Sequence, residues 1–106
     1  MSSFIYMAVD FFLKQDEVGF GENGGCGIAG LKKISEAAEK VGYKPFVVVS
    51  KNNTKYSDTL FLMSDNKRKT VDKQGFLAIL QAVAETKPDE FTDIHSDGTK
   101  LRLWWD

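Results

Sequence analysis

The side chains best suited to covalent chemistry are one cysteine and one histidine, each the only residue of its type among 106. Cys26 directly precedes a run with helical spacing, and a helix N-terminus lowers the pKa of a thiol. Asp93 lies two residues before His95, so on a strand its carboxylate would share a face with the imidazole and orient it. Together the three would supply a nucleophile, a base and an orienting acid. The competing interpretation is a small buried thiol and a surface histidine, since thiols are among the most buried side chains.

The glycine-rich stretch 19–30 offers a second kind of site, for an anion. Glycines leave backbone N–H groups free to point at a ligand, and a helix N-terminus adds partial positive charge. The amides that would bind a phosphate or carboxylate belong to Gly25, Cys26, Gly27 and Ala29. The stretch is not a P-loop, because Leu31-Lys32-Lys33 follows Gly30 where a Gly-Lys-Ser/Thr sequence is required. A flexible loop without a ligand is the competing interpretation.

The same stretch also carries a family resemblance. Gly24-Gly25-Cys26-Gly27-Ile28-Ala29, the helical run after it and Phe46-Val47-Val48-Val49 resemble the coenzyme A pyrophosphate loop, helix and following strand of the acyl-CoA N-acetyltransferase superfamily. Met7-Ala8-Val9-Asp10 resembles the strand before that loop. The resemblance implies a coenzyme A-dependent transferase whose pyrophosphate is bound by backbone amides at Cys26, Gly27 and Ala29. The sequence departs from the family at Gly24, where the family has Arg or Gln.

The C-terminal end of the chain has the composition of a protein interface. On a strand from Lys100 to Trp105, alternation would place Arg102 and Trp104 outward, with Leu101, Leu103 and Trp105 in the core. An exposed Trp beside an Arg is typical of an interface hot spot. The carboxylates around them are Asp89, Glu90, Asp93 and Asp97. We therefore predict one protein partner with a basic surface, steered by opposite charge; the competing interpretation is a solvated acidic face with Trp104 shielding an edge strand.

Hydrophobic periodicity predicts the elements that position these residues. The apolar runs 4–13, 46–50 and 59–63 indicate strands, the first of them buried on both faces and central in its sheet. Apolar positions recur every three or four residues over 27–41 and from Phe76 to Val83, which predicts two helices. The second helix would be capped by Thr70 and ended by Pro88. Asp97-Gly98 predicts a hairpin that joins 91–95 to 100–105.

The resulting order is β-α-β-β-α-β-β, an α+β chain. Its first six elements match a ferredoxin-like sandwich, in which a mainly antiparallel sheet has strands one and three at its centre and two helices on one face. The C-terminal hairpin would add an extra strand at an edge. We expect residues 1–106 to form a single compact domain, because a chain of this length can bury one core.

Composition excludes several classes of function. Fourteen Lys and Arg against 15 Asp and Glu give a net charge of −1, so we expect no direct nucleic acid and no membrane as partners. We expect the N-terminal residues to form neither a signal peptide nor a membrane span, because their apolar part has no Lys or Arg before it and is short. One unpaired cysteine fits a reducing compartment, which predicts a cytoplasmic protein. One Cys and one His cannot fill a four-ligand metal site, and no cofactor is expected.

Three function classes follow. The leading one is a small cytoplasmic binding or inhibitor protein that neutralises a partner by occlusion, as an immunity protein does for a bacterial toxin, for example a nuclease toxin, or as a phage anti-defence inhibitor does. The second is a small Cys-dependent or coenzyme A-dependent transferase or hydrolase using the glycine-rich loop; we favour it less, because an enzyme needs convergent polar groups that this chain barely supplies. The third is a structural or assembly subunit that pairs through a sheet edge. The sequence leaves the oligomeric state open.

Overall fold

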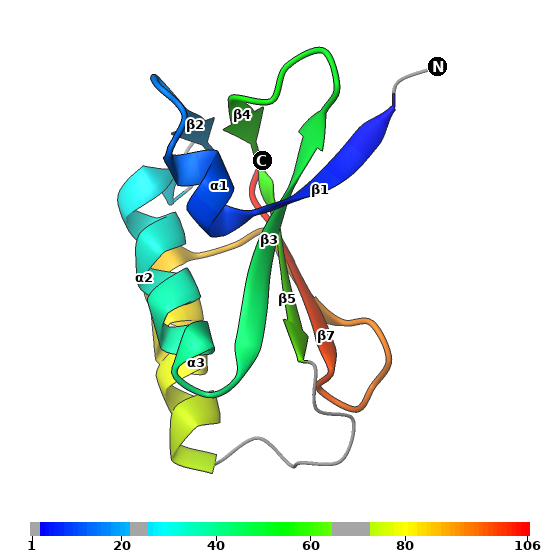
Figure 1. Cartoon of the computed structure of the whole chain (residues 1–106). Coiled ribbons are helices and arrows are strands. Elements are labelled where there is room, and N and C mark those ends of the chain that lie inside the picture. Colours follow the sequence, from blue (N-terminus) through cyan, green and yellow to red (C-terminus); the bar gives the residue numbers. More distant parts are fainter. Residues whose placement is uncertain (1–2, 22–25, 65–72) are drawn as a thin grey trace.

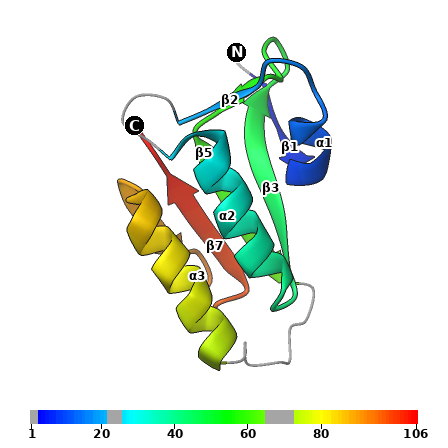
Figure 2. The ribbon, with the colours of Figure 1, turned by 90° about the vertical axis from the view of Figure 1, so that its left-hand side faces the viewer.

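The protein has two layers, a five-stranded antiparallel sheet and two long helices that lie together on one face of it (Figures 1 and 2). The computed structural model describes residues 3–21, 26–64 and 73–106. In that part of the chain the opposite face of the sheet carries no helix. The α+β class with a mainly antiparallel sheet is therefore confirmed. No helix in these ranges is long and apolar enough to cross a bilayer.

The main sheet has the strand order β1-β3-β5-β7-β6, and every neighbouring pair is antiparallel. Its strands are β1 (Phe4–Ala8), β3 (Tyr43–Ser50), β5 (Thr59–Ser64), β6 (Glu90–Asp93) and β7 (Lys100–Trp104). A second, two-stranded sheet pairs β2 (Gly19–Phe20) with β4 (Tyr56–Ser57) in parallel. The two hairpins predicted from the sequence are both present, and Gly98 takes a positive φ of 76° in the turn between β6 and β7.

Helices α2 (Gly27–Glu39) and α3 (Lys73–Thr86) lie side by side across the inner face of the sheet (Figure 2). The apolar positions that predicted α2 are those that it buries, including Leu31, Ile34 and Ala38. Helix α3 also packs closely at Gly75 on the turn after α2, where an added Cβ would lie only 1.9 Å from Cγ1 of Val41. The predicted cap of the second helix, Thr70, lies outside the described residues.

The core is one cluster between the helices and the sheet, and Trp105 closes one end of it. Trp105 is fully buried, its Nε1–H donates to the carbonyl of Thr86 at 2.9 Å, and its ring meets that of Phe20 at 5.3 Å. A Cβ at Gly21 would lie 3.2 Å from the Cβ of Trp105, and Gly21 has a φ of 54°. Glycine is therefore the residue that fits this approach of the loop to the core.

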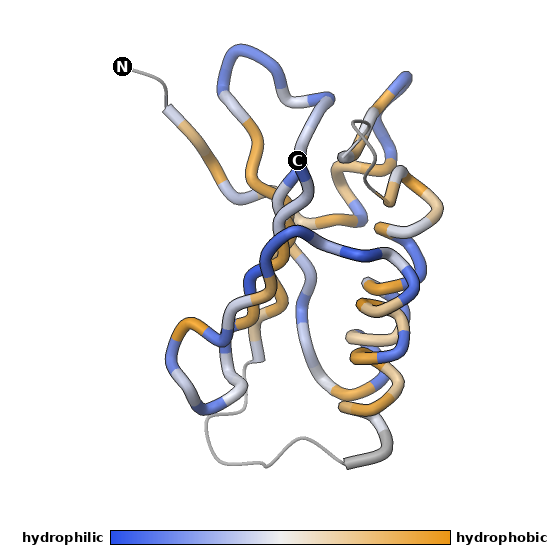
Figure 3. The backbone as a smooth tube through the Cα atoms, turned by 180° about the vertical axis from the view of Figure 1, so that it is seen from behind, coloured by the Kyte–Doolittle hydropathy of each residue, from blue (hydrophilic) through white to orange (hydrophobic). Residues whose placement is uncertain are grey.

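The prediction of a central first strand over 4–13 is wrong, and the ferredoxin-like order is not confirmed. β1 ends at Ala8 and lies at an edge of the sheet, and residues Val9–Leu13 form the short helix α1. Val9 and Phe12, three residues apart, are the side chains that α1 buries, so the run changes from strand to helix spacing halfway along. Most of β1 is exposed, and Figure 3 shows this apolar strand leading away from the helices. The continuous apolar run therefore forms an exposed edge strand and a short helix, and not one strand covered on both faces.

Candidate functional site

The sheet face without a helix carries several aromatic side chains, and we call it the open face. Along β7, Leu101 and Leu103 are buried toward the helices, so Arg102 and Trp104 lie on the opposite face, as the alternation predicted. The strand register extends this face across the sheet, because Arg102 is opposite Phe61 and Tyr6 is opposite Val48. The open face comprises Phe4, Tyr6, Val48, Phe61, Lys100, Arg102 and Trp104.

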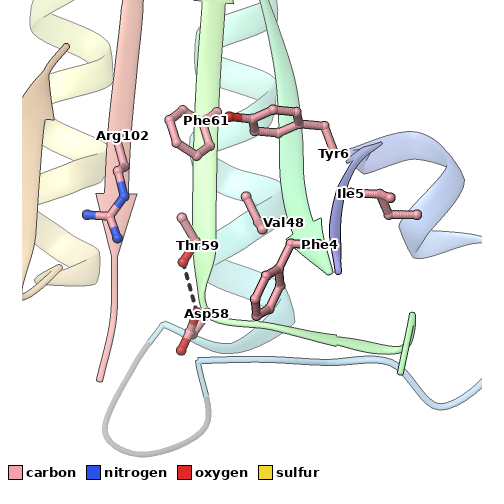
Figure 4. Close-up of a pocket in the computed structure, with 8 residues that line it drawn as sticks. All are labelled: Phe4, Ile5, Tyr6, Val48, Asp58, Thr59, Phe61 and Arg102. Atoms are coloured by element: carbon pink, nitrogen blue, oxygen red, sulfur yellow. Dashed lines mark hydrogen bonds between the residues drawn. The ribbon is translucent and has the colours of Figure 1, made fainter. Parts of the chain in front are cut away.

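The open face has a groove of about 520 Å³ near the N-terminal end of β1 (Figure 4). Phe4, Tyr6 and Phe61 surround it with aromatic rings, and Asp58 and Arg102 supply charged groups at its other side. Phe4 is 63% exposed and Tyr6 53% exposed. The groove is therefore open along β1, and most of its lining is apolar.

The aromatic lining is ordered by contacts within the protein. The rings of Tyr6 and Phe61 meet edge to face, and the ammonium of Lys100 lies 5.1 Å from the centroid of the Phe61 ring and 5.6 Å from that of Tyr6. Edge-to-face packing and a cation over a ring are both favourable geometries. Phe61 is consequently only 8% exposed, whereas Tyr6 stays accessible.

Trp104 and Arg102 continue the open face toward the other edge of the sheet. Trp104 is half-buried and lies opposite Thr59 on one neighbouring strand and Glu90 on the other. Nη1 of Arg102 donates to Oε2 of Glu90 at 3.0 Å. The predicted pair of outward residues therefore adjoins the groove, and Glu90 lies beside it.

The other predicted acidic residues bond within the chain. Asp93 accepts the N–H of Gly98 at 2.9 Å, and Asp89 accepts the N–H of Asp106 at 2.6 Å. Asp97 accepts from the hydroxyl and the N–H of Thr99, and these bonds, the hydroxyl first, lower the pKa of the Asp97 carboxyl. Asp93 and Asp97 therefore stabilise the turn of the hairpin and do not line the groove.

The structure does not bring the three candidate catalytic residues together. His95 is exposed in the turn after β6, so its predicted place on a strand is wrong, and the carboxylate of Asp93 bonds to the Gly98 amide. Cys26 lies at the start of α2 near Trp105, whereas His95 lies beside Lys100. The length of β7 separates those two places (Figure 1). A nucleophile, base and acid arrangement is therefore not formed.

The pKa of the Cys26 thiol is shifted in the direction opposite to the predicted one. Burial raises the pKa of Cys26 to about 11, which outweighs the lowering by a backbone hydrogen bond. The thiol packs against its own helix, because a Cβ at Gly30 would lie 2.3 Å from the Cβ of Cys26. Cys26 is thus a protonated, half-buried packing residue at neutral pH.

The anion site predicted at the glycine-rich stretch stays a prediction. Cys26, Gly27 and Ala29 do lie at the first turn of α2, where Gly27 has a φ of 65°, and Gly25 lies outside the described residues. The N–H of Gly30 already donates to the carbonyl of Cys26 at 3.2 Å. Over residues 3–21, 26–64 and 73–106, no group of three or more His, Cys, Asp or Glu is placed to hold a metal ion.

Sequence reasoning missed the aromatic half of the open face. The apolar pattern places Phe4 and Tyr6 on a strand covered on both sides, and Phe61 on the returning strand of a hairpin. An apolar run looks alike whether helices cover one of its faces or both. Only the pairing of β1 with β3 and the position of α2 and α3 leave these rings uncovered.

Comparisons of the chain with protein-family models, with curated proteins and with solved structures found no match. The resemblance to acyl-CoA N-acetyltransferases therefore stays an expectation from the sequence. The strand expected at Met7–Asp10 ends at Ala8, which further separates this chain from that pattern.

Proposed function

We propose that this protein binds one partner protein through its open face and neutralises the partner by covering a surface that the partner needs. The observation that carries the proposal is the aromatic groove on the sheet face that no described helix covers. Exposed apolar patches on small domains mark interaction sites more often than chance. Aromatic rings with an adjoining Arg and Trp are the residue types that dominate interface binding energy.

The charges around the groove favour a partner with an apolar centre and basic surroundings. Asp58 lines the groove, Glu90 pairs with Arg102, and Asp89 hydrogen-bonds to the chain beyond Trp104. These three carboxylates outnumber the two cations near the groove, which are the Arg102 guanidinium, paired with Glu90, and the Lys100 ammonium, which lies over the aromatic rings. Opposite charge on the partner would raise the association rate more than the affinity.

Occlusion requires no catalytic group from this chain, which agrees with a protonated thiol at the opposite end of β7 from the single histidine. A toxin that acts on nucleic acid has a basic active site, and an acidic, aromatic surface would complement it. We therefore infer an immunity protein for such a toxin or a phage-encoded inhibitor of a defence system, acting in the cytoplasm.

The test compares Trp104→Ala with a matched control at Leu77, which is 58% exposed on α3 and away from the open face. The immobilised wild type and the Leu77→Ala variant should capture the same stoichiometric partner from host cells. We expect Trp104→Ala to capture it at least about tenfold more weakly, as a hot-spot truncation does, and wild-type protein to abolish the partner's activity.

The association rate should also fall as ionic strength rises, because salt screens the steering charges. Equal capture by the Trp104 variant and the control would contradict the assigned surface. A partner that keeps full activity when saturated with this protein would contradict neutralisation.

A further inference from the structure

Strand β1 leaves one edge of the main sheet unpaired among the described residues, and we propose that a second copy of this chain pairs with that edge. β1 is the first strand in the sheet order, with β3 as its single neighbour there. The product would be a two-fold symmetric dimer in which two antiparallel β1 strands join the sheets of the two copies. This dimer does not require the partner proposed above, and the two surfaces share Phe4 and Tyr6 of β1.

The backbone of β1 has its hydrogen-bonding groups directed to that edge. The N–H of Lys51 donates to the carbonyl of Ser3 at 3.0 Å, which sets the phase of the antiparallel ladder between β1 and β3. Bonded and non-bonded pairs alternate in such a ladder, so Ile5 and Met7 bond to β3. The N–H and C=O groups of Phe4 and Tyr6 consequently point away from β3, where a second strand can pair with them.

The two edges of the sheet differ in how they are protected. β6, at the far edge, carries Glu90 and Asp93, and charges on an edge strand oppose pairing with another chain. β1 consists of Phe-Ile-Tyr-Met-Ala and has no charge, proline or glycine. Only the β1 edge therefore lacks the devices by which natural sheets avoid edge-to-edge association.

Side-chain exposure adds apolar area at the same place. Phe4, Ile5 and Tyr6 are 63%, 36% and 53% exposed, and Phe11 on the adjoining α1 is 61% exposed. With side-chain areas of 150–250 Å² for aromatic residues, these exposed parts amount to roughly 400 Å² per copy. A standard interface buries about 800 Å² per partner, so the patch with the paired backbone supports a weak dimer.

The chemistry of β1 selects its own copy as the occupant. The β1 edge has no charged side chain that could pair with the charges of a charged strand. A second β1 is itself apolar, and the antiparallel pairing of two β1 strands is self-complementary. With Ile5 on the two-fold axis, Phe4 of one copy lies opposite Tyr6 of the other on the open face. Aromatic cross-strand pairs of this kind stabilise antiparallel sheets.

Sedimentation equilibrium tests the proposal with the chain alone. The weight-average mass should rise with concentration from 11.9 kDa toward twice that value. Tyr6→Pro removes an N–H that β3 does not use and should abolish the rise, whereas Leu77→Ser, on α3, should leave it unchanged. Circular dichroism of each variant checks that the fold is retained.

A cross-link gives a second readout that does not require the proline variant to fold. In a Cys26→Ser background, Ile5→Cys should form a disulfide-linked dimer under mild oxidation, because directly opposed non-bonded pairs have Cα atoms about 4.5 Å apart. Leu77→Cys in the same background is the matched control and should stay monomeric. A mass of 11.9 kDa at every concentration, or a dimer that persists in folded Tyr6→Pro without the position 5 cross-link, would overturn the proposal.

Discussion

Tyr6 and Phe61 meet edge to face across strand β3, with ring centroids 5.2 Å apart and ring planes at 87°. Tyr6 belongs to the edge strand β1 and Phe61 to β5, so the contact joins two strands that are not neighbours. It supports one side of the groove, and Lys100 lies over both rings. The groove is therefore shaped before any partner binds, which lowers the entropy lost on binding.

The two adjacent tryptophans should respond in opposite ways to truncation. Trp105 is fully buried and bonded to Thr86, so Trp105→Ala should lower the free energy of unfolding by about 3–5 kcal/mol. Trp104 is half-buried on the open face, and Trp104→Ala should cost under about 1.5 kcal/mol, because little core volume is lost. Urea unfolding followed by circular dichroism measures both, and equal losses would place Trp104 in the core.

The Cys26 thiol should react slowly below strongly alkaline pH. Burial raises its pKa to about 11, so the thiolate fraction at pH 8 is roughly 100-fold below that of an unperturbed thiol. We expect the alkylation rate with iodoacetamide to rise through a midpoint near this pKa in the folded chain and near an ordinary thiol pKa in urea. Rapid alkylation of the folded chain at neutral pH would instead restore the thiol-nucleophile hypothesis.

Tyr43 should contribute stability that is lost at high pH. Its hydroxyl donates to the carbonyl of Gly98 at 2.5 Å, and burial, followed by the charges of Asp93 and Asp97, raises the pKa of Tyr43. Because the folded state binds this proton more tightly, stability is complete below the unfolded pKa of about 10 and falls as pH rises above it.

Tyr43→Phe should therefore lower the free energy of unfolding by about 1 kcal/mol at neutral pH. The difference between variant and wild type should shrink as pH rises above about 10. Urea titrations across this pH range measure it. A difference that grows with pH would contradict this account. Because Cys26 also has a raised pKa, the same titration of Cys26→Ser shows how much of the pH dependence belongs to the thiol.

Gly75 should be required for the close packing of α3 on Val41, two residues beyond the end of α2. A Cβ at Gly75 would lie 1.9 Å from Cγ1 and 3.0 Å from Cβ of Val41. Gly75→Ala should destabilise the protein by about 1–3 kcal/mol through overpacking, although alanine favours the helix by about 1 kcal/mol. Adding Val41→Ala should recover part of the loss in a double-mutant cycle; additive losses would exclude the clash.

The sequence predicted the elements at the C-terminal end well and those at the N-terminal end poorly. Asp97-Gly98 forms the turn between β6 and β7, and residues 101–105 alternate between core and open face as their pattern indicated. The pattern of residues 4–13 predicts one buried strand, but they divide into an exposed strand and a helix. The continuous apolar run hid the change of period at Val9, because nearly every residue in it is hydrophobic.

By itself the sequence determined the α+β class, the two long helices, both hairpins and the outward direction of Arg102 and Trp104. These features depend on local spacing, since side-chain period and turn residues act over a few positions. Only the tertiary structure decided the strand order, the open face and the distance between Cys26 and His95. Those depend on long-range pairing among apolar strands of similar composition, and β1, β3 and β5 each carried a pattern compatible with the centre of the sheet.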